Sequence, residues 1–495
     1  MKQKIINELK KYQISFLSSI FFGLISYMYM FTNKFPNGDD VRFLFYKGGS
    51  VSHGRWGLEL VSIILPDVSM PWLWGIISIF ILSFSAYLII KIYCIENKYF
   101  QIFLSAIIMT FPSNICIFTY MFTSTGYMIA ALFSILSVYF IYKRKNKINY
   151  CFAVICSVLQ LSIYQPYITT TSSLLVIILI LDLINDCDIK EVFIKGVRFF
   201  IFLMSSLAMY FIITKLIFLI SNTGFGDYAS ESISCNSSVL KSILIMIKHF
   251  VYSIVMISGL SPTPLARFCH IFIIMLCVIA TSFIVKERKI SLIKVACIIL
   301  LSFILIISIE ALRFIYGGFQ IMMFFGFISF YILIASISAS TEKKYFEKIT
   351  AIILALISIS NVYTANKTYT IMGLEYENSY AYFSALTTQI QMTPGYREDT
   401  KVYIIGQSNM EITSSKNMPP LYRFCSGDMI HMPTKKHFIK NYINSNMKIA
   451  SNSETKKFLN RNNIDSMPVY PNYGSIRMID NSIVVKLGTG NEIDD

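Results

Sequence analysis

The chain has 495 residues, of which 55% are hydrophobic and only 14% are charged, and it contains 40 Phe and 31 Tyr. This composition excludes an ordinary soluble globular protein and predicts an α-helical polytopic membrane protein with one soluble appendage. The formal net charge of +15 would suggest nucleic-acid binding in a soluble protein, but membrane proteins collect Lys and Arg in the loops on one side of the bilayer.

The first apolar run extends from Ile14 to Phe31 and follows an N-terminal tail with four lysines. It is long, aromatic and lacks a small-residue cleavage site, so it predicts a retained transmembrane helix and not a signal peptide. Ten further runs are long enough to cross about 30 Å of hydrocarbon, which gives about eleven spans. They cover residues 71–92, 100–118, 121–142, 149–165, 167–184, 198–220, 267–285, 291–310, 318–338 and 348–363.

The distribution of basic residues predicts the orientation of these spans. If the N-terminus is cytoplasmic, the inside segments hold about 20 Lys and Arg residues and the outside segments about 8. This assignment places the first outer loop, residues 33–70, and the C-terminal tail outside the cytoplasm. In segment 53–65 apolar residues recur at helical spacing, and segment 239–260 would break the charge alternation if it were a span. Both segments therefore predict short helices that lie in the membrane interface.

The first outer loop carries the densest group of chemically active side chains in the chain. Asp39 and Asp40 follow the turn-forming run Pro36-Asn37-Gly38, and Arg42, His53 and Arg55 come soon after. The paired carboxylates suit a general base or the binding of a divalent cation, although a solvated turn or a helix cap is the commoner role of such a pair. The arginines suit a phosphate or lipid headgroups, and His53 alone indicates little.

Two further groups are candidate substrate-binding residues. Tyr164 and Gln165 precede Pro166 where two spans meet on the outer side, and such a break either lines a cavity or forms a tight hairpin. Glu310 and Arg313 lie one helical turn apart and are expected first of all to pair with each other. In the long outer loop, Asp227 and Glu231 are more simply explained as solvated acids.

The predicted transmembrane region, residues 1–363, is followed by a mixed polar segment, residues 364–495, that is large enough for a small α/β domain. Strands are expected at Lys401–Gln407 and on either side of Asp480-Asn481, where a short polar turn predicts a hairpin. Helices are expected at Lys435–Lys448 and Ser453–Arg461, the second without a capping box. The charges of this segment nearly balance, so nucleic-acid binding is not indicated.

Several motifs of other enzyme classes are absent from the sequence. It contains no Walker A loop, no GxGxxG after a strand, no HExxH and no GxSxG. The cysteines form no CxxC motif, so neither a zinc site nor a disulfide framework is predicted. No cofactor is indicated beyond the divalent cation already considered.

The pattern of the first outer loop resembles the serotype-converting O-antigen glucosyltransferases of bacteria, which are polytopic enzymes of the GT-C type. The resemblance is carried by the Tyr164-Gln165 corner, by the strand-rich ending of the tail and by Asp39, Asp40, Arg42, Gly48 or Gly49, Gly54 and Arg55. The chain departs from the expected pattern in the tight Asp-Asp-Val-Arg spacing and in Trp56, where proline is expected. These departures bear on the sugar and the acceptor more than on the reaction class.

The resemblance implies transfer of glucose from undecaprenyl phosphate to a surface polysaccharide, with an acid of the first loop as base and Arg42 or Arg55 on the donor phosphate. The enzyme would act on the outer face of the bacterial cell membrane. Two other functions fit a polytopic protein: a transporter or flippase of lipid-linked glycans, and a non-catalytic envelope-assembly protein. A transporter is expected to have charged residues near the bilayer midplane and broken spans in two matching halves, and the sequence offers little beyond Lys215.

Overall fold

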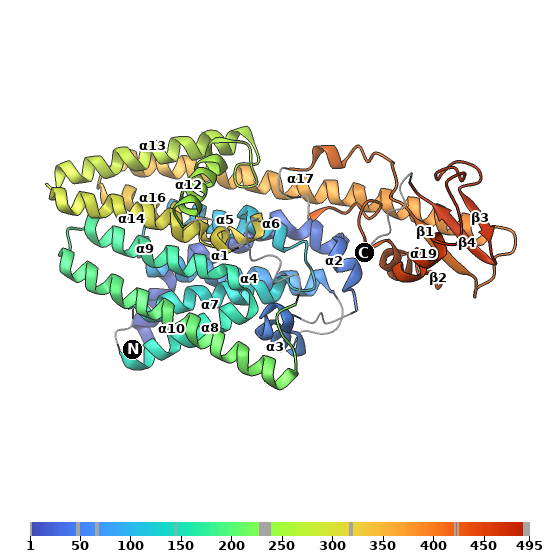
Figure 1. The fold of residues 1–495 in the computed structure, drawn as a ribbon. Helices are drawn as coiled ribbons and strands as arrows, with labels where there is room; N and C mark the ends of the chain where they lie inside the picture. Colours follow the sequence, from blue (N-terminus) through green and yellow to red (C-terminus); the bar gives the residue numbers. More distant parts are fainter. Residues whose placement is uncertain are drawn as a thin grey trace. The chain divides into compact units, whose positions relative to one another are not determined.

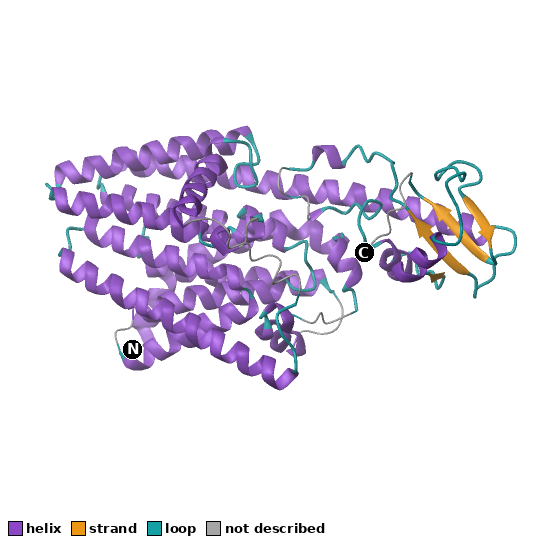
Figure 2. Ribbon diagram, in the orientation of Figure 1, coloured by secondary structure: helices purple, strands orange, loops and turns teal. Residues whose placement is uncertain are grey.

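The computed structural model describes residues 2–45, 50–64, 69–143, 146–226, 239–315, 320–419, 422 and 425–488. Gly48, Gly49, Asp227 and Glu231 lie outside the described residues. The chain forms two compact units (Figures 1 and 2). The helical unit comprises Met1–Thr32, Lys47–Asn366 and Pro419–Leu421, and the sheet unit comprises Asn33–Tyr46, Lys367–Met418 and Tyr422–Asp495.

The helical unit is a bundle of long apolar helices (Figure 2). Its helices are α1 (Lys2–Asn33), α3 (Trp56–Ile64), α4 (Pro71–Ile92), α5 (Lys98–Thr110), α6 (Pro112–Ile117), α7 (Ser124–Lys143), α8 (Lys147–Ile163), α9 (Ile168–Ile184), α10 (Ile189–Ser221), α12 (Val239–Val255), α13 (Pro264–Glu287), α14 (Leu292–Glu310), α15 (Leu312–Ile315), α16 (Ile328–Ser340) and the first part of α17 (Lys344–Gln391). Short 3-10 turns occur at η1 (Val51–His53), η2 (Gln165–Tyr167), η3 (Ile321–Met323) and η4 (Phe325–Phe327).

Nine of the described helices are long and apolar enough to cross a membrane. Two other predicted spans, 149–165 and 318–338, correspond to the shorter apolar helices Lys147–Ile163 and Phe325–Ser340. The lipid-compatible surface is evident on α10 and α14, where large apolar side chains such as Ile220 and Leu292 are exposed. The chain is therefore a membrane protein, since water would not tolerate so much apolar surface.

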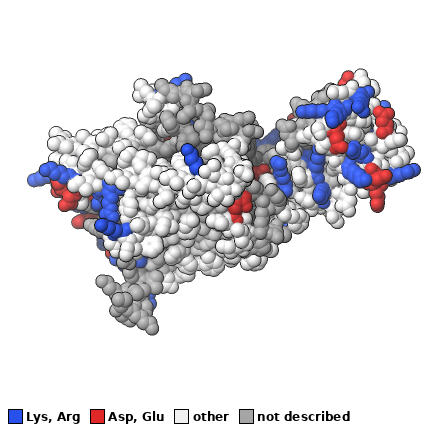
Figure 3. Space-filling model, turned by 60° about the horizontal axis from the view of Figure 1, so that its bottom comes forward, with Lys and Arg blue, Asp and Glu red and all other residues white. Residues whose placement is uncertain are grey.

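The loops predicted to be cytoplasmic meet at one end of the helical unit. Lys11 pairs with Glu96, and Asn97 donates to Glu347 at 2.7 Å. Arg288 donates to the backbone oxygens of Ile184 and Ser340 at 3.1 and 2.9 Å. These bonds join segments far apart in the sequence, as the alternating arrangement of spans requires. Charged side chains gather there, while the long sides of the bundle in view are almost uncharged (Figure 3).

Helix α3 packs closely against the other end of α7 and α8. A Cβ at Gly57 would lie 2.0 Å from Ser162 Oγ, so only glycine permits this approach. Leu60, Ile63 and Ile64 remain exposed on the opposite side of α3, and the predicted helix in this segment is confirmed. Gly54, just before it, has φ +72°, a left-handed conformation that glycine adopts without strain.

The sheet unit contains a four-stranded sheet in the order β2-β1-β4-β3. Its elements are α2 (Gly38–Arg42), the second part of α17, β1 (Lys401–Ile405), η5 (Ser415–Asn417), α18 (Lys435–Asn441), β2 (Lys448–Ile449), α19 (Asn452–Leu459), β3 (Ile476–Ile479) and β4 (Ser482–Lys486). β1 pairs in parallel with β2 and β4, and β3 pairs antiparallel to β4 with Ile479 opposite Ser482.

Alternating side chains of the strands build two hydrophobic layers, as the period of two in a strand requires. Val402 and Val485 pack with Phe383 of α17 and Phe438 of α18. On the opposite face, smaller in extent, Val484 packs with residues that include Phe458 of α19. Val41 of α2 belongs to the larger layer and is fully buried, which anchors α2 in the sheet unit.

The predicted hairpin is confirmed, because β3 and β4 are joined by Asp480 and Asn481, which both have positive φ. Asn and Asp tolerate this conformation, which a two-residue turn of this kind needs. The prediction of α19 without a capping box is wrong: Ser451 is the N-cap and exchanges hydrogen bonds with Glu454. The N-cap lies two residues before the expected Ser453, and this shift brings Glu454 to the third helical position, where the capping box needs it.

Candidate functional site

Asp39 and Asp40 lie in the first turn of α2. Asn37 caps this helix, because its Oδ1 accepts a hydrogen bond from the Asp40 N–H at 2.9 Å. Asparagine is among the best N-cap residues, and carboxylates in a first turn interact favourably with the helix dipole. The cap of this helix is therefore Asn37, and neither acid has that role.

The two acids differ in exposure: Asp39 is exposed, whereas Asp40 is fully buried. Tyr442, which follows α18, lies within electrostatic range of Asp40. Burial raises the pKa of Tyr442, and the Asp40 carboxylate raises it further, so the phenol remains protonated at neutral pH. An acceptor hydroxyl can approach Asp39 from solvent, while Asp40 is enclosed by protein.

Arg42 ends α2 and is exposed. Its guanidinium carbon lies 5.6 Å from the centroid of the Phe43 ring. Partial burial raises the pKa of Asp39, and the Arg42 charge opposes this shift. The helix is fixed to α18 by Asn441, whose Nδ2 donates to the backbone oxygen of Val41 at 3.0 Å. A carboxylate and a guanidinium are therefore presented together on one short, anchored helix.

A second polar group, which we call the Arg55 cluster, lies in the helical unit. Arg55 Nε donates to Gln165 Oε1 at 3.2 Å, and Nη1 donates to the Tyr127 hydroxyl at 3.1 Å. The guanidinium carbon also lies 5.2 Å from the centroid of the Tyr164 ring, a cation–π distance. Gln165 Nε2 and the Tyr210 hydroxyl are 3.2 Å apart, and Tyr210 donates to the Gly54 oxygen at 3.0 Å.

The aromatic side of this cluster is tightly packed. The Tyr127 and Tyr164 rings are stacked with centroids 4.0 Å apart, and Tyr167 meets Tyr164 edge-on at 5.4 Å. Within the described part of the chain, the buried hydroxyls of Tyr164 and Tyr167 have no hydrogen-bond partner. Buried polar atoms normally find one, so these two hydroxyls mark a place where a polar ligand or water would be stabilised.

His53 lies beside the Arg55 cluster, and its backbone oxygen accepts a hydrogen bond from Gln165 at 2.9 Å. Burial lowers the pKa of His53, and the nearby Arg55 charge lowers it further. The imidazole is therefore neutral at pH 7. A neutral imidazole can donate or accept a proton but adds no charge to the cluster.

Glu310 and Arg313 form the predicted pair: Arg313 Nε lies 2.8 Å from Glu310 Oε2. Glu310 is fully buried, and its second oxygen, Oε1, has no hydrogen-bond partner among the described residues. A buried carboxylate is costly unless it is paired, which explains why the two residues occur together. No hydrogen bond between described residues links this pair to the Arg55 cluster.

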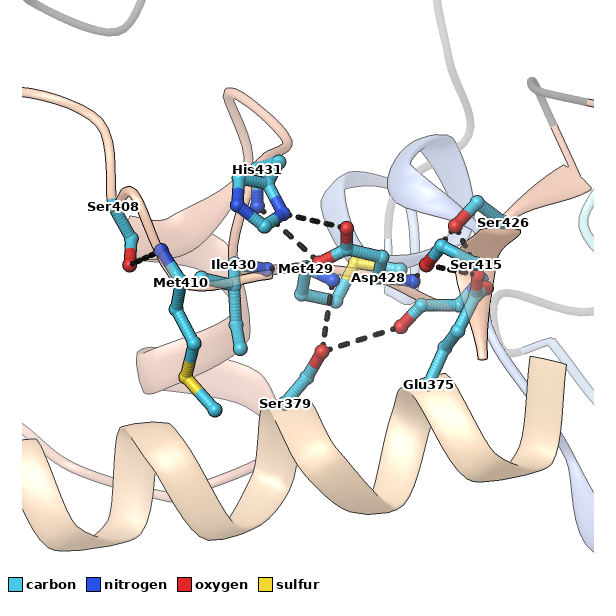
Figure 4. A network of polar contacts seen from close by, with 11 residues as sticks. Glu375, Ser379, Ser408, Met410, Ser415, Ser426, Asp428, Met429, Ile430 and His431 are labelled. Carbon is cyan, nitrogen blue, oxygen red and sulfur yellow. Dashed lines mark hydrogen bonds and ion pairs between the residues drawn. The ribbon is translucent and has the colours of Figure 1, made fainter. Parts of the chain in front are cut away.

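A polar network of the sheet unit was not expected from the sequence (Figure 4). Glu375 of α17 accepts hydrogen bonds from Ser415, Ser426 and the Gly427 N–H at 2.6, 2.7 and 2.8 Å. Its buried carboxylate thus pins two loops onto α17. In the same loop, the Asp428 carboxylate lies 2.7 Å from His431 Nδ1 and raises the pKa of His431.

The structure thus groups some of the predicted site residues and separates others. Arg55 lies with Gln165, Tyr164 and the His53 backbone, and α2 carries Asp39, Asp40 and Arg42. Tyr127 and Tyr210 complete the Arg55 cluster but were missed, because a tyrosine within an apolar span looks like any other core or lipid-facing aromatic. Among the described residues, no three His, Cys, Asp or Glu side chains gather as they would around a metal ion.

Comparison with known families gives one match. The family described as "Glucosyl transferase GtrII" matches residues 28–335, which is more than half of the chain and includes α2, the Arg55 cluster and the Glu310–Arg313 pair. This match confirms the resemblance inferred from the first outer loop. The curated proteins and the solved structures gave no match.

Proposed function

The chain belongs to the glucosyl transferase GtrII family, and from this premise we propose that it transfers glucose from a polyprenyl-phosphate donor to a glycan on the extracytoplasmic side of the membrane. Membership supports a glycosyltransferase, and the apolar helices fit a donor with a lipid tail. The absence of a nucleotide-binding motif from the sequence favours a lipid-linked donor over a nucleotide sugar.

The observation that carries the mechanism is the contrast between Asp39 and Asp40. Asp39 is the accessible carboxylate and acts as the general base that takes the proton of the acceptor hydroxyl. The hydroxyl oxygen then attacks the anomeric carbon, and the bond from that carbon to the phosphate oxygen breaks. Asp40 is fully buried and acts as a positioning residue that holds the first turn of α2.

Arg42 is the proposed partner of the lipid phosphate, because it lies on the same helix as Asp39 and is exposed. Negative charge accumulates on the phosphate oxygen as the bond to the sugar breaks, and a guanidinium with paired donors stabilises this charge. Arg55 is the alternative. Its guanidinium is held by Gln165 and Tyr127, so it is preorganised for an anion or a sugar hydroxyl.

The proposed orientation has the N-terminus in the cytoplasm and both α2 and the C-terminal tail outside. It rests on the excess of Lys and Arg in the loops that gather at one end of the helical unit. A membrane-impermeant thiol reagent tests it on intact cells. Cysteine introduced at exposed Asn460 should be labelled without permeabilisation. Native Cys94, which is exposed in a loop predicted to be cytoplasmic, should be labelled only after permeabilisation.

The reaction is tested with labelled glucose on synthetic undecaprenyl phosphate and isolated membranes. We expect Asp39→Asn to lower transfer by about 10²- to 10⁴-fold, the usual contribution of a general base. Asp399→Asn is the matched control, because Asp399 is an exposed acid of the same unit outside α2. Full transfer by Asp39→Asn would remove it as the base, and no transfer by the wild type would reject the donor.

A further inference from the structure

Helices α2 and α18 lie alongside each other in the sheet unit and run in the same direction. At their starts, a Cβ added to Gly38 would lie 3.8 Å from Thr434 Oγ1, the residue before α18. At their ends, Asn441 donates its hydrogen bond to Val41. The last turns of both helices are therefore neighbours, with the buried side chains of Val41 and Phe438 between them and the sheet.

Basic side chains collect along this pair of helices. Arg42, His437 and Lys440 are exposed, and His437 and Lys440 lie one turn apart on the same face of α18. The partial cover of its ring by protein lowers the pKa of His437, and the charges of Arg42, Lys440 and Lys436 lower it further. The charged groups that act on His437 in the described part of the chain are thus all cationic. Figure 3 shows Lys and Arg side chains spread over the sheet unit.

The repulsion between these like charges is unfavourable, although the Asp39 carboxylate on α2 offsets part of the Arg42 charge. Lys436 Nζ donates a hydrogen bond to Asn452 Oδ1 at 3.0 Å. A ligand with two negative charges would relieve this repulsion. The guanidinium and ammonium groups suit phosphate oxygens, and the neutral imidazole adds one further N–H donor.

We propose that Arg42, His437 and Lys440 form a binding site for the phosphate monoester of a polyprenyl phosphate, the product that remains after the sugar has left. This inference rests on the proposed function, which it deepens. The donor phosphate is a diester with one negative charge. After transfer it becomes a monoester with a charge of about −1.5 to −2. Two cations and a hydrogen-bonding N–H group therefore match the monoester product better than they match the sugar-bearing diester. They also match the negative charge that forms on the phosphate during the reaction.

The test measures binding and does not depend on transfer. Full-length protein in nanodiscs of zwitterionic lipid is titrated with farnesyl phosphate, its methyl diester and farnesol. Wild type should bind the monoester most tightly. Lys440→Gln should weaken monoester binding about tenfold, the loss expected for one charge-assisted contact, and His437→Ala should weaken it less. Lys457→Gln is the control, because Lys457 is an exposed lysine on α19.

Added inorganic phosphate separates the two sources of the ligand. If it displaces farnesyl phosphate from the wild type at similar concentration, the site binds free phosphate as well as the lipid headgroup. If it does not, the lipid is required for binding, and both results support a phosphate site. The proposal would be overturned if the wild type bound monoester, diester and farnesol equally. It would also be overturned if a folded Lys440→Gln protein bound the monoester as tightly as the wild type does.

Failure of the site and failure of the proposed function can be told apart. Binding that depends on Lys440, without glucose transfer from undecaprenyl phosphate, would keep the phosphate site and reject the reaction. Normal transfer with binding that is indifferent to Lys440 and His437 would keep the reaction and reject the site. Lys440→Arg, which retains the charge, should preserve binding and so distinguishes a lost cation from a misfolded α18.

Discussion

Gln165 Oε1 lies 3.2 Å from Arg55 Nε, although 110 residues separate the two in the sequence. The same amide donates through Nε2 to the His53 oxygen at 2.9 Å. One side chain thus sets the orientation of the guanidinium and fixes the turn that precedes it. This double role distinguishes Gln165 from a residue that only closes a helical hairpin.

We therefore expect Gln165→Leu to lower glucose transfer at least tenfold, because the loss of hydrogen bonds to a charged group and to a partly buried carbonyl costs about 1.5–3 kcal/mol. Gln165→Glu should keep the hydrogen bond to Arg55 but lose the one donated to the His53 oxygen, so glucose transfer should fall by less. The initial rate of labelled glucose transfer at matched expression measures both. If Gln165→Leu transferred glucose at the wild-type rate, the Arg55 cluster would have no part in the reaction.

The Glu310–Arg313 pair makes a prediction about stability. Arg313→Met removes the partner of a fully buried carboxylate, and breaking such a pair costs about 3–5 kcal/mol. Glu310→Gln in the same chain removes the stranded charge and should restore most of the loss. The half-life of the detergent-solubilised protein at elevated temperature reports the difference. An Arg313→Met protein as durable as wild type would contradict the structural role of the pair.

The Asp428–His431 contact makes a prediction about pH. Hydrogen bonding to Asp428 raises the pKa of His431 above its usual value near 6.5. Since the folded pKa is the higher one, the stabilisation is complete below about pH 6.5 and is lost as the pH rises through the folded pKa. The imidazole is 35% exposed, so solvent screening keeps the effect below about 1 kcal/mol.

Hydrogen exchange detects this effect locally. The amides of Ile430 and His431 donate to Asp428 Oδ1 at 3.0 and 3.3 Å, so their protection should decrease between pH 6.5 and 8 after correction for the intrinsic rate. His431→Gln should remove the pH dependence and leave a constant, lower protection. The same pH dependence in that variant would assign the titration to another group.

The approach of α3 to α8 predicts a compensating pair of substitutions. Gly57→Ala places a Cβ 2.0 Å from Ser162 Oγ and 2.9 Å from Ser162 Cβ, so α3 must move outward. Ser162→Gly in the same chain should recover part of the lost transfer, although it costs roughly 1 kcal/mol as a helix glycine. Ser162→Ala should recover less, because its Cβ remains. Transfer by the three variants, compared with Ser162→Gly alone, decides this prediction.

The sequence was most informative where physical constraints are local or periodic. Apolar runs of sufficient length predicted the membrane helices, and Asp480-Asn481 predicted the hairpin, because few other residues tolerate positive φ at both turn positions. The spacing of Glu310 and Arg313, one helical turn apart, likewise predicted their ion pair. The capping box of α19 was missed because the two serines Ser451 and Ser453 are both plausible caps, and the start of a helix is the least certain feature of a pattern.

The grouping of side chains that are distant in sequence could not be predicted in this way. Tyr127 and Tyr210 join the Arg55 cluster only through the packing of α7 and α10 near α8. The exposure of Asp39 and the burial of Asp40 depend on how α2 sits on α18, some 400 residues later in the chain. A one-residue difference in sequence therefore decides which carboxylate meets solvent, and only the tertiary contacts reveal it.

The hydrogen bond between Asn441 and Val41 also determines when α2 can fold during synthesis of the chain. Residue 41 leaves the ribosome long before residue 441, and synthesis at about 5–20 residues per second separates them by roughly 20–80 s. Throughout that interval α2 has neither the sheet nor α18 to pack against, and five residues are too few to hold a helix alone. The acids at its start can reach their final positions only when the last quarter of the chain has been made, so a prematurely terminated chain would contain Asp39 and Arg42 but lack the surface that arranges them.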